Sequence, residues 1–273
     1  MRQFLITLAG VLAGLILFSI AVPVILVIWL GAVARPAPLP DRVVLDLDLR
    51  GALTDQPSAN PLAALRGSGL SVIGVERTLR RASGDPKVGA LLVRLPEGGM
   101  APAVADELAL AFHRFRAAGK PILAFSQGLF QDGAVVSTYR LAAASGNIWM
   151  QAGAPFQVSG LSRAELFFKR FFDRHAISAD FQQRAQYKTA VNPLIYSDYT
   201  SAHRESELSW MGSVYDADLA AAAADRSMDA GRLRRLIEAA PYSAENARAA
   251  GLIDATADGR AAEKAILAKA GDD

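Results

Sequence analysis

Apolar and polar positions along the chain alternate in segments of two different periods. Residues 43–49 alternate apolar and acidic side chains, which is typical of a half-buried strand. Residues 88–95 form a nearly continuous apolar run, as strands buried on both faces do. Between these two segments, Val75, Leu79 and Ala82 are spaced for one face of a helix that ends near residues 84–86. The pattern therefore predicts a strand, a helix and a second strand.

The same alternation continues toward the C-terminus. Further helices are predicted over residues 103–118, 134–144 and 163–175, and further strands over residues 121–125, 148–150 and 177–184. Beyond Thr200 the chain is mostly helical, with predicted helices over residues 201–224, 229–239 and 243–250. Strands that alternate with helices predict an α/β fold, in which helices cover the faces of a largely parallel sheet.

The N-terminal segment is long and apolar. Residues 3–34 carry no charged side chain, and residues 4–29 are interrupted only by Thr7, Ser19 and Pro23. A helix needs roughly 20 apolar residues to cross a bilayer, and this run is longer. A cleaved signal peptide is the alternative, because residues 32–34 read Ala-Val-Ala, although its apolar region usually spans only about 7–15 residues. The length favours a retained transmembrane anchor over residues 1–34.

The orientation of this anchor depends on few charges. Arg2 precedes the apolar run and Arg35 and Arg42 follow it, so the positive-inside rule decides little. Short N-terminal tails normally stay cytoplasmic, so we expect the soluble part on the outer, periplasmic face of a bacterial-type inner membrane. A stiff linker over residues 35–42 is predicted by the prolines Pro36, Pro38 and Pro40. One domain over residues 43–273 follows.

Composition excludes several classes of function. The chain is 52% hydrophobic with a net charge of +2, and no dense basic run is interleaved with aromatic residues, so nucleic acid is not an expected partner. The absence of cysteine excludes disulfides, a thiolate nucleophile and Cys-ligated zinc. No two of the three histidines have the i, i+4 spacing of a helical metal site. We therefore expect neither a metal nor another cofactor.

The histidines have ordinary explanations. His113 and His203 stand beside charged residues, so both are expected to be solvated. His175 ends a phenylalanine-rich helical segment, where it suits the negative end of the helix dipole. The phenylalanines themselves indicate core or subunit contacts.

Two segments could support chemistry. Gly98 and Gly99 follow an apolar strand, and their backbone N–H groups could form an oxyanion hole; a tight strand-to-helix turn explains the same residues and is favoured by their types. Lys188 is surrounded by mostly apolar neighbours. Desolvation disfavours an ammonium group, so a lysine withdrawn from water can act as a base toward a serine hydroxyl. The alternative is a solvated surface lysine.

Five segments, taken in order, resemble the long form of signal peptide peptidase A, a family of membrane-bound serine proteases. They are residues 49–62, 84–99, 117–128, 186–205 (QYKTAVNPLIYSDYTSAHRE) and 242–254. The resemblance covers nearly the whole chain and points to the N-terminal half of that family. It implies a crotonase/ClpP-like repeated ββα spiral with a helical C-terminal part, preceded by one transmembrane helix.

The resemblance also implies roles for individual residues. Lys188 occupies the position of the general base, and Tyr187, Thr189 and Pro193 support its loop. Thr189 stands where the family usually has serine. The loop departs from the family at two positions: Ala185 replaces a glycine, and Asn192 replaces a glutamate.

The nucleophile is harder to place. In the corresponding stretch GAVVSTYRLA (residues 133–142), the place of the nucleophile is occupied by Val136, and Ser137 comes one residue later. One residue turns a helical side chain by about 100°, which is enough to miss a preformed oxyanion hole. Ser137 is therefore disfavoured as a nucleophile and better explained as a hydroxyl at a helix N-terminus. Ser126 is a weaker candidate still.

Three functions follow from these observations. The leading one is the Lys-bearing half of a membrane-anchored Ser-Lys endopeptidase that degrades signal-peptide remnants and other apolar peptides, with its serine supplied by a C-terminal half or another chain. Expected partners are these peptides, membrane lipid along residues 4–29, and further copies of the chain. The alternative is a non-catalytic anchored scaffold of crotonase-like fold; a natural protein that ends at Asp273 would favour it, and a fragment would favour the protease. The anchor and the Lys188 loop argue against the third, an acyl-CoA enzyme.

Overall fold

The computed structural model describes residues 1–33, 40–57, 69–130 and 132–271, which belong to two compact units, Met1–Pro40 and Asp41–Asp273. Most of the expected linker, residues 35–39, lies outside the described residues, as does Ala34 of the Ala-Val-Ala sequence. Each unit is described by itself below.

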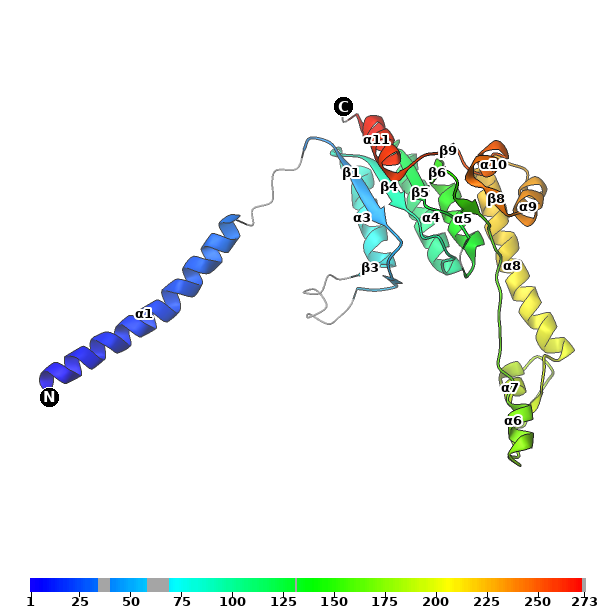
Figure 1. Cartoon of the computed structure of the whole chain (residues 1–273), viewed down its shortest axis with the longest axis horizontal. Coiled ribbons are helices and arrows are strands. Elements are labelled where there is room, and N and C mark those ends of the chain that lie inside the picture. Colours follow the sequence, from blue (N-terminus) through cyan, green and yellow to red (C-terminus); the bar gives the residue numbers. More distant parts are fainter. Residues whose placement is uncertain (34–39, 58–68, 131, 272–273) are drawn as a thin grey trace. The chain divides into compact units, whose positions relative to one another are not determined.

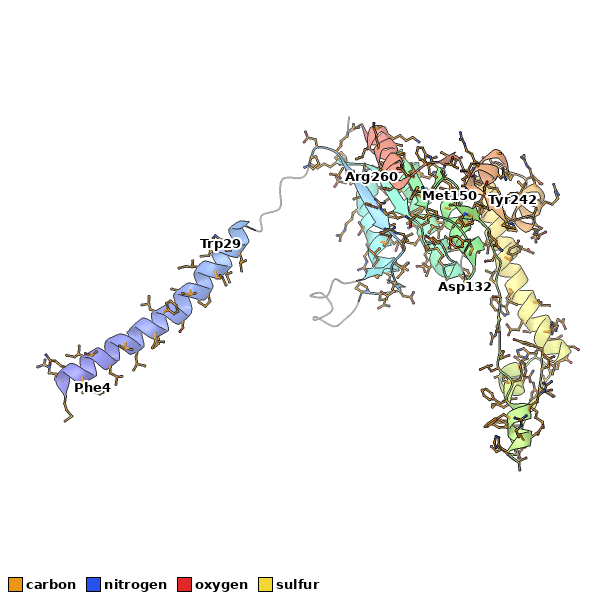
Figure 2. The ribbon with its side chains drawn as sticks, viewed as in Figure 1. Phe4, Trp29, Asp132, Met150, Tyr242 and Arg260 are labelled. Atoms are coloured by element: carbon orange, nitrogen blue, oxygen red, sulfur yellow. The ribbon has the colours of Figure 1, made fainter. Side chains whose placement is uncertain are left out.

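The first unit consists of one helix, α1 (Arg2–Val33). Within residues 2–31 of this helix, an 18-residue stretch has a mean hydropathy of 3.0, and the helix is long and apolar enough to cross a membrane, by length and composition. Pro23 lies inside the helix, and the side chains between Phe4 and Trp29 project from all sides of it (Figure 2). A helix that is apolar all round needs an apolar environment on every side, which is the pattern of a membrane span.

The second unit is built on a five-stranded sheet. Its strand order is β1-β4-β5-β6-β9, and every neighbouring pair is parallel. The strands are β1 (Val43–Asp48), β4 (Val88–Arg94), β5 (Ile122–Ser126), β6 (Ile148–Met150) and β9 (Ala255–Thr256). The first four strands lie side by side in chain order, so the sheet grows in one direction through repeated strand–helix units. The predicted α/β class with a parallel sheet is confirmed.

Helices cover both faces of this sheet. Leu91 and Val93 of β4 pack into the larger core, which also contains the buried faces of α3 (Val72–Gly84), α4 (Pro102–Ala117) and α5 (Val135–Ala144). Ala90 and Leu92 point to the opposite face and pack against α11 (Gly259–Ala270). Both sides of β4 are therefore buried, which explains its continuous apolar run.

One long helix, α8 (Ser201–Asp225), belongs to the core along only half of its length. Its second half packs on α5 through buried residues that include Leu219 and Ala222. Its first half projects from the sheet, and the short helices α6 (Lys169–Arg174) and α7 (Asn192–Ile195) lie at its far end (Figure 1). We call residues 161–214, which include this projecting half of α8, the arm.

Short elements complete the domain. A two-residue parallel pair joins β2 (Leu53–Thr54) to β3 (Leu70–Ser71), and an antiparallel pair joins β7 (Pro155–Phe156) to β8 (Tyr242–Ser243). Between α8 and α11 lie the helices α9 (Ala230–Glu238) and α10 (Ala244–Ala249).

Two elements predicted from the sequence pattern are wrong in the arm. The helix predicted over residues 163–175 is reduced to α6, and residues 177–184 form no strand. Ile177 and Phe181 favour a strand by residue type, yet they remain 48% and 45% exposed and pair with no strand in the described part of the chain. Propensity without a surface to pack against does not fix an element, because tertiary contacts supply most of its stability.

Candidate functional site

The loop that carries Lys188 lies at the outer end of the arm. Lys188 immediately precedes a short 3-10 turn, Thr189–Val191, which continues into α7. Pro193 lies in the first turn of α7, where its missing N–H group costs no helical hydrogen bond. The carbonyl of Pro193 accepts a hydrogen bond of 2.7 Å from the N–H of Phe168, which ties the loop to the start of α6.

The loop is also held on α8. The Tyr187 hydroxyl donates to Glu205 Oε2 at 2.9 Å, and this hydrogen bond to a carboxylate raises the pKa of Tyr187. Gln183 Nε2 donates to the backbone carbonyl of Lys188 at 2.7 Å and to Asn192 Oδ1 at 3.1 Å. Several contacts therefore fix the main chain around Lys188.

The side chain of Lys188, in contrast, is exposed. Within the part of the chain that the structure describes, its ammonium group makes no hydrogen bond and no ion pair. The lysine withdrawn from water that the sequence suggested is therefore not found among the described residues. Such a lysine needs a covering surface that comes from outside the described residues.

Ser137 lies in the core. It is fully buried on α5, and its hydroxyl donates to Asp218 Oδ2 of α8 at 2.6 Å. Burial raises the pKa of the Asp218 carboxyl, and the hydrogen bond from Ser137 opposes that rise. The hydroxyl does not cap the helix as expected; it joins two helices. Val136, at the implied place of the nucleophile, is also fully buried.

The structure does not bring Ser137 and Lys188 together. The Lys188 loop contacts α8 at Glu205, whereas Ser137 contacts it at Asp218. These positions are 13 residues apart (218 − 205), which corresponds to roughly 20 Å along a helix that rises about 1.5 Å per residue. The two side chains therefore do not form a dyad within this chain.

The paired glycines form a tight turn. The N–H of Gly99 donates to Asp132 O at 2.8 Å, and the N–H of Met100 donates to Thr138 Oγ1 at 3.1 Å. A Cβ atom on Gly99 would lie 2.1 Å from the backbone nitrogen of Ala134, so only glycine fits there. The N–H groups of Gly99 and of the following Met100 are therefore used within the chain, and the close approach of Gly99 to Ala134 supports the turn explanation for this segment.

Sequence reasoning missed a buried polar cluster at the base of the Lys188 loop. His203 is only 2% exposed, so the expectation of a solvated histidine is wrong. Its Nε2 lies 3.3 Å from Glu165 Oε2 and 3.6 Å from Glu207 Oε1, and Arg163 lies within ion-pair distance of both carboxylates. Tyr199 packs on the imidazole at a centroid distance of 4.7 Å. The cluster joins Arg163 and Glu165, which lie on the segment that leads into the arm, to α8.

One signal of this cluster was visible in the sequence. His203 and Glu207 are spaced i, i+4, so they lie on the same face of a helix. Glu165 comes from a distant segment, which no local pattern connects to them. Among the described residues, no three His, Asp or Glu side chains are arranged to hold a metal ion. His113 is half-buried and pairs with Asp225 at 2.8 Å, while His175 is exposed at the C-terminal end of α6.

Comparison with solved structures yields distant neighbours. A membrane-bound stomatin-specific protease in complex with a substrate peptide is 14% identical, with a TM-score of 0.41, over 81% of this chain and 78% of that chain. An enoyl-CoA hydratase/isomerase family protein from Silicibacter pomeroyi is 17% identical, with a TM-score of 0.41, over 84% of this chain and 77% of that chain.

Sequence comparison is more specific. Protease 4 of Salmonella typhi is 26% identical over 200 residues, which cover 68% of this chain and 31% of that protein. Protease 4 of Haemophilus influenzae is 27% identical over 178 residues, or 64% of this chain and 28% of that protein. The chain thus spans about a third of the length of these curated relatives. The model of peptidase family S49 matches residues 114–271, more than half of the chain and a range that includes both Ser137 and Lys188. On that match, the chain belongs to peptidase family S49.

Proposed function

We propose that this chain supplies Lys188 as the general base of a Ser-Lys peptidase, and that the nucleophilic serine comes from a C-terminal half or from another chain. The observation that carries the proposal is the contrast within the Lys188 loop. Its main chain is fixed by contacts to α6 and α8, while its amine is exposed and unpaired among the described residues. Such an amine is available to a site that a second domain completes.

The reaction would follow the established logic of Ser-Lys catalysis. The neutral Lys188 amine removes the proton of the serine hydroxyl as the serine oxygen attacks the peptide carbonyl, and the lysine then gives that proton to the departing amine. Water, activated by the same lysine, hydrolyses the resulting acyl-enzyme, and the serine is regenerated. A second domain has two further tasks. It covers Lys188 so that the neutral amine is favoured, and it supplies oxyanion donors, since Gly99 and Met100 use theirs internally.

The proposed substrates are apolar peptides, such as signal-peptide remnants, presented near a bilayer. Support comes from α1, whose length and hydropathy suit a transmembrane helix. In this proposal residues 1–34 form a single-pass anchor that meets lipid along residues 4–29, residues 35–42 form a linker, and residues 43–273 form the peptidase domain on the outer face of a bacterial-type inner membrane. A domain held there would meet peptides that leave the bilayer.

A non-catalytic scaffold is the second candidate, and one observation favours it. The arm exposes large apolar side chains, including Leu166 at 76%, Leu208 at 60% and Phe171 at 53%. Exposed apolar groups in this density indicate a surface that another protein covers. Assembly, with copies of this chain or with a different one, is common to both candidates, so the arm alone does not decide between them.

Fluorophosphonate labelling of serines distinguishes the two candidates. The full-length chain is labelled within the membranes of the cells that produce it, and labelled serines are identified by mass spectrometry. Lys188→Met is compared with the wild type, and Lys169→Met, on the same arm, is the matched control.

The peptidase proposal predicts a labelled serine on a polypeptide segment that co-purifies with the chain, and loss of that labelling in Lys188→Met but not in Lys169→Met. Labelling that persists in Lys188→Met would support the scaffold. Labelling of Ser137 itself would contradict both candidates, because it requires a complete dyad in one chain.

A further inference from the structure

We propose that Gln183 and Asn192 form an amide clamp that positions Lys188, an inference that rests on the proposed function and names two further residues of the same site. The clamp consists of one primary amide that grips the main chain of Lys188 and a second, buried amide that holds the first in place. Neither residue touches the reacting atoms, so both act as positioning residues.

The hydrogen bonds of the clamp start from the amide nitrogen of Gln183, which donates both to Lys188 and to Asn192. Gln183 Nε2 carries two hydrogens, and both are used: one meets the carbonyl of Lys188 at 2.7 Å and the other meets Asn192 Oδ1 at 3.1 Å. Asn192 Nδ2 in turn lies 3.5 Å from Thr200 Oγ1, at the long limit of a hydrogen bond. The Gln183 amide therefore donates to both of its neighbours, while Asn192 accepts through its oxygen and donates through its nitrogen.

This polarity fixes the orientation of both amides. If the Gln183 amide were reversed, its oxygen would face the carbonyl oxygen of Lys188, which has no hydrogen to donate. With the nitrogen of Gln183 facing Asn192, the asparagine must present its oxygen, and its nitrogen then faces Thr200. The clamp thus has one consistent arrangement of donors and acceptors.

Burial gives the clamp its strength. Asn192 is fully buried although it lies at the tip of the arm, where α7 and the Lys188 loop meet. A buried primary amide without partners costs free energy, so Asn192 is a rigid support only while its hydrogen bonds are made.

The clamp ends on the first turn of α8. Thr200 is the N-cap residue of that helix, and its Oγ1 accepts a hydrogen bond of 3.2 Å from the N–H of His203. A continuous series of hydrogen bonds therefore runs from the carbonyl of Lys188 to the N-cap of α8, which fixes the loop to the helix that supports it.

The clamp is made of neutral groups. Asn192 stands where the resembling family usually has a glutamate, so in this chain the loop is held by amide dipoles and not by a carboxylate. The neutral amide is a property of this chain, and a substitution that changes only its donors and acceptors tests it without altering the size of the side chain.

The experiment has a structural and a catalytic part, both on the full-length chain. Hydrogen–deuterium exchange reports the loop through the N–H groups of Lys188 and Tyr196, which donate to Ala185 O at 3.2 Å and to Asn192 O at 2.9 Å. In Gln183→Ala, and in Gln183→Glu, which keeps the shape but replaces the donors, these N–H groups should exchange at least about tenfold faster. Gln182→Ala, the exposed neighbour, is the matched control and should exchange like the wild type.

The catalytic part uses the rate of fluorophosphonate labelling in the native membranes. A positioning residue affects the maximal labelling rate, which should fall about tenfold or more in Gln183→Ala, while the probe concentration that gives half of that rate stays unchanged. In Asn192→Asp the oxygen that accepts from Gln183 is kept, so this variant should retain more of the rate than Asn192→Ala does.

Each result has one meaning. Faster loop exchange together with a reduced maximal rate supports the clamp. If Lys188→Met abolishes labelling but Gln183→Ala changes neither exchange nor rate, the clamp is overturned and the proposed function stands. If Gln183→Ala loosens the loop while Lys188→Met leaves labelling intact, the proposed function fails and the positioning role fails with it.

Discussion

The hydroxyl of Ser137 lies 2.6 Å from the carboxylate of Asp218, in a buried hydrogen bond that joins α5 to α8. Ser137 is therefore buried in the interior of the domain, where it is not accessible to a peptide substrate. Asp218 marks the part of α8 that belongs to the core, from which the rest of the helix projects toward the Lys188 loop.

We expect Ser137→Ala to lower the free energy of unfolding by about 1–2 kcal/mol, because it leaves the Asp218 carboxylate buried without its donor. Denaturant unfolding measures the change. Ser213→Ala, an exposed serine on the same helix, is the control and should be nearly neutral. A loss of fluorophosphonate labelling at unchanged stability would instead make Ser137 a nucleophile.

Asp218→Asn tests the burial of the carboxyl. Since the folded-state pKa of Asp218 is raised, the protonated form favours folding: its contribution is fully present below the ordinary pKa near 4 and is lost as pH rises through the folded value. The asparagine oxygen still accepts from Ser137 without a buried charge.

The variant should therefore gain on the wild type as pH rises, by about 1 kcal/mol at pH 7, or a melting temperature roughly 2–4 °C higher. Thermal melts from pH 4 to pH 7 measure this difference. A difference that is constant over the range would contradict the raised pKa.

Gly99→Ala is expected to be strongly destabilising. The added Cβ would lie 2.1 Å from the backbone nitrogen of Ala134, and a backbone atom cannot move away as a flexible side chain can. Overpacking of this kind costs about 3 kcal/mol or more. Gly51→Ala is the matched control, because a Cβ there meets nothing within 4 Å. Equal melting temperatures for Gly99→Ala and Gly51→Ala would contradict this prediction.

His203→Ala should weaken the attachment of residues 161–168, the segment that leads into the arm, to α8. The substitution removes a buried ring that packs on Tyr199 and takes one partner from each of Glu165 and Glu207, at a cost of about 2–4 kcal/mol. Hydrogen exchange in residues 161–168 and 199–207 should rise. His113→Ala, which breaks a half-exposed pair with Asp225, should change stability by less than about 1 kcal/mol. Exchange confined to α6 would contradict the role of His203.

The chain contains no cysteine, so an introduced cysteine is a unique label. We expect a membrane-impermeant maleimide to label Lys264→Cys, on the exposed face of α11, in intact spheroplasts. Arg2→Cys should be labelled only after the membrane is permeabilised. The reverse pattern would place the domain in the cytoplasm and contradict the proposed outer location.

The core of the fold could be predicted because its residues carry a strong pattern. The run at 88–95 is apolar on both sides since Leu91 packs on one layer and Leu92 on the other. β9 was missed because its two residues, Ala255 and Thr256, are too few to show a period. In the arm, Phe171 and Phe181 have the hydrophobicity of core residues but stay exposed, so their spacing carried no information about a buried face.

The site was predicted only as far as local sequence reaches. The role of Lys188 and the demotion of Ser137 both came from the resemblance of their segments to a known family, and the role of Lys188 stays a prediction. The partners that fix these residues come from elsewhere: Asp218 is 81 positions from Ser137. Glu205 contacts the loop only because α8 folds back along it. Such pairings depend on tertiary structure, which no local pattern contains.

The division of α8 into a packed half and a projecting half makes the helix a lever. Its fulcrum lies near Asp218 and Leu219, and its free end holds Glu205, which binds the loop of Lys188. Because roughly 20 Å of helix separates Asp218 from Glu205, a tilt of about 10° near Asp218 moves the end of the helix at Glu205 by roughly 3.5 Å. A displacement of this size is as large as the separation of the reacting atoms in a productive complex, which is about 3–3.5 Å. In the proposed site, substitutions of small buried residues such as Ala222, which alter the packing of α8 on the core, would therefore shift the position of Lys188.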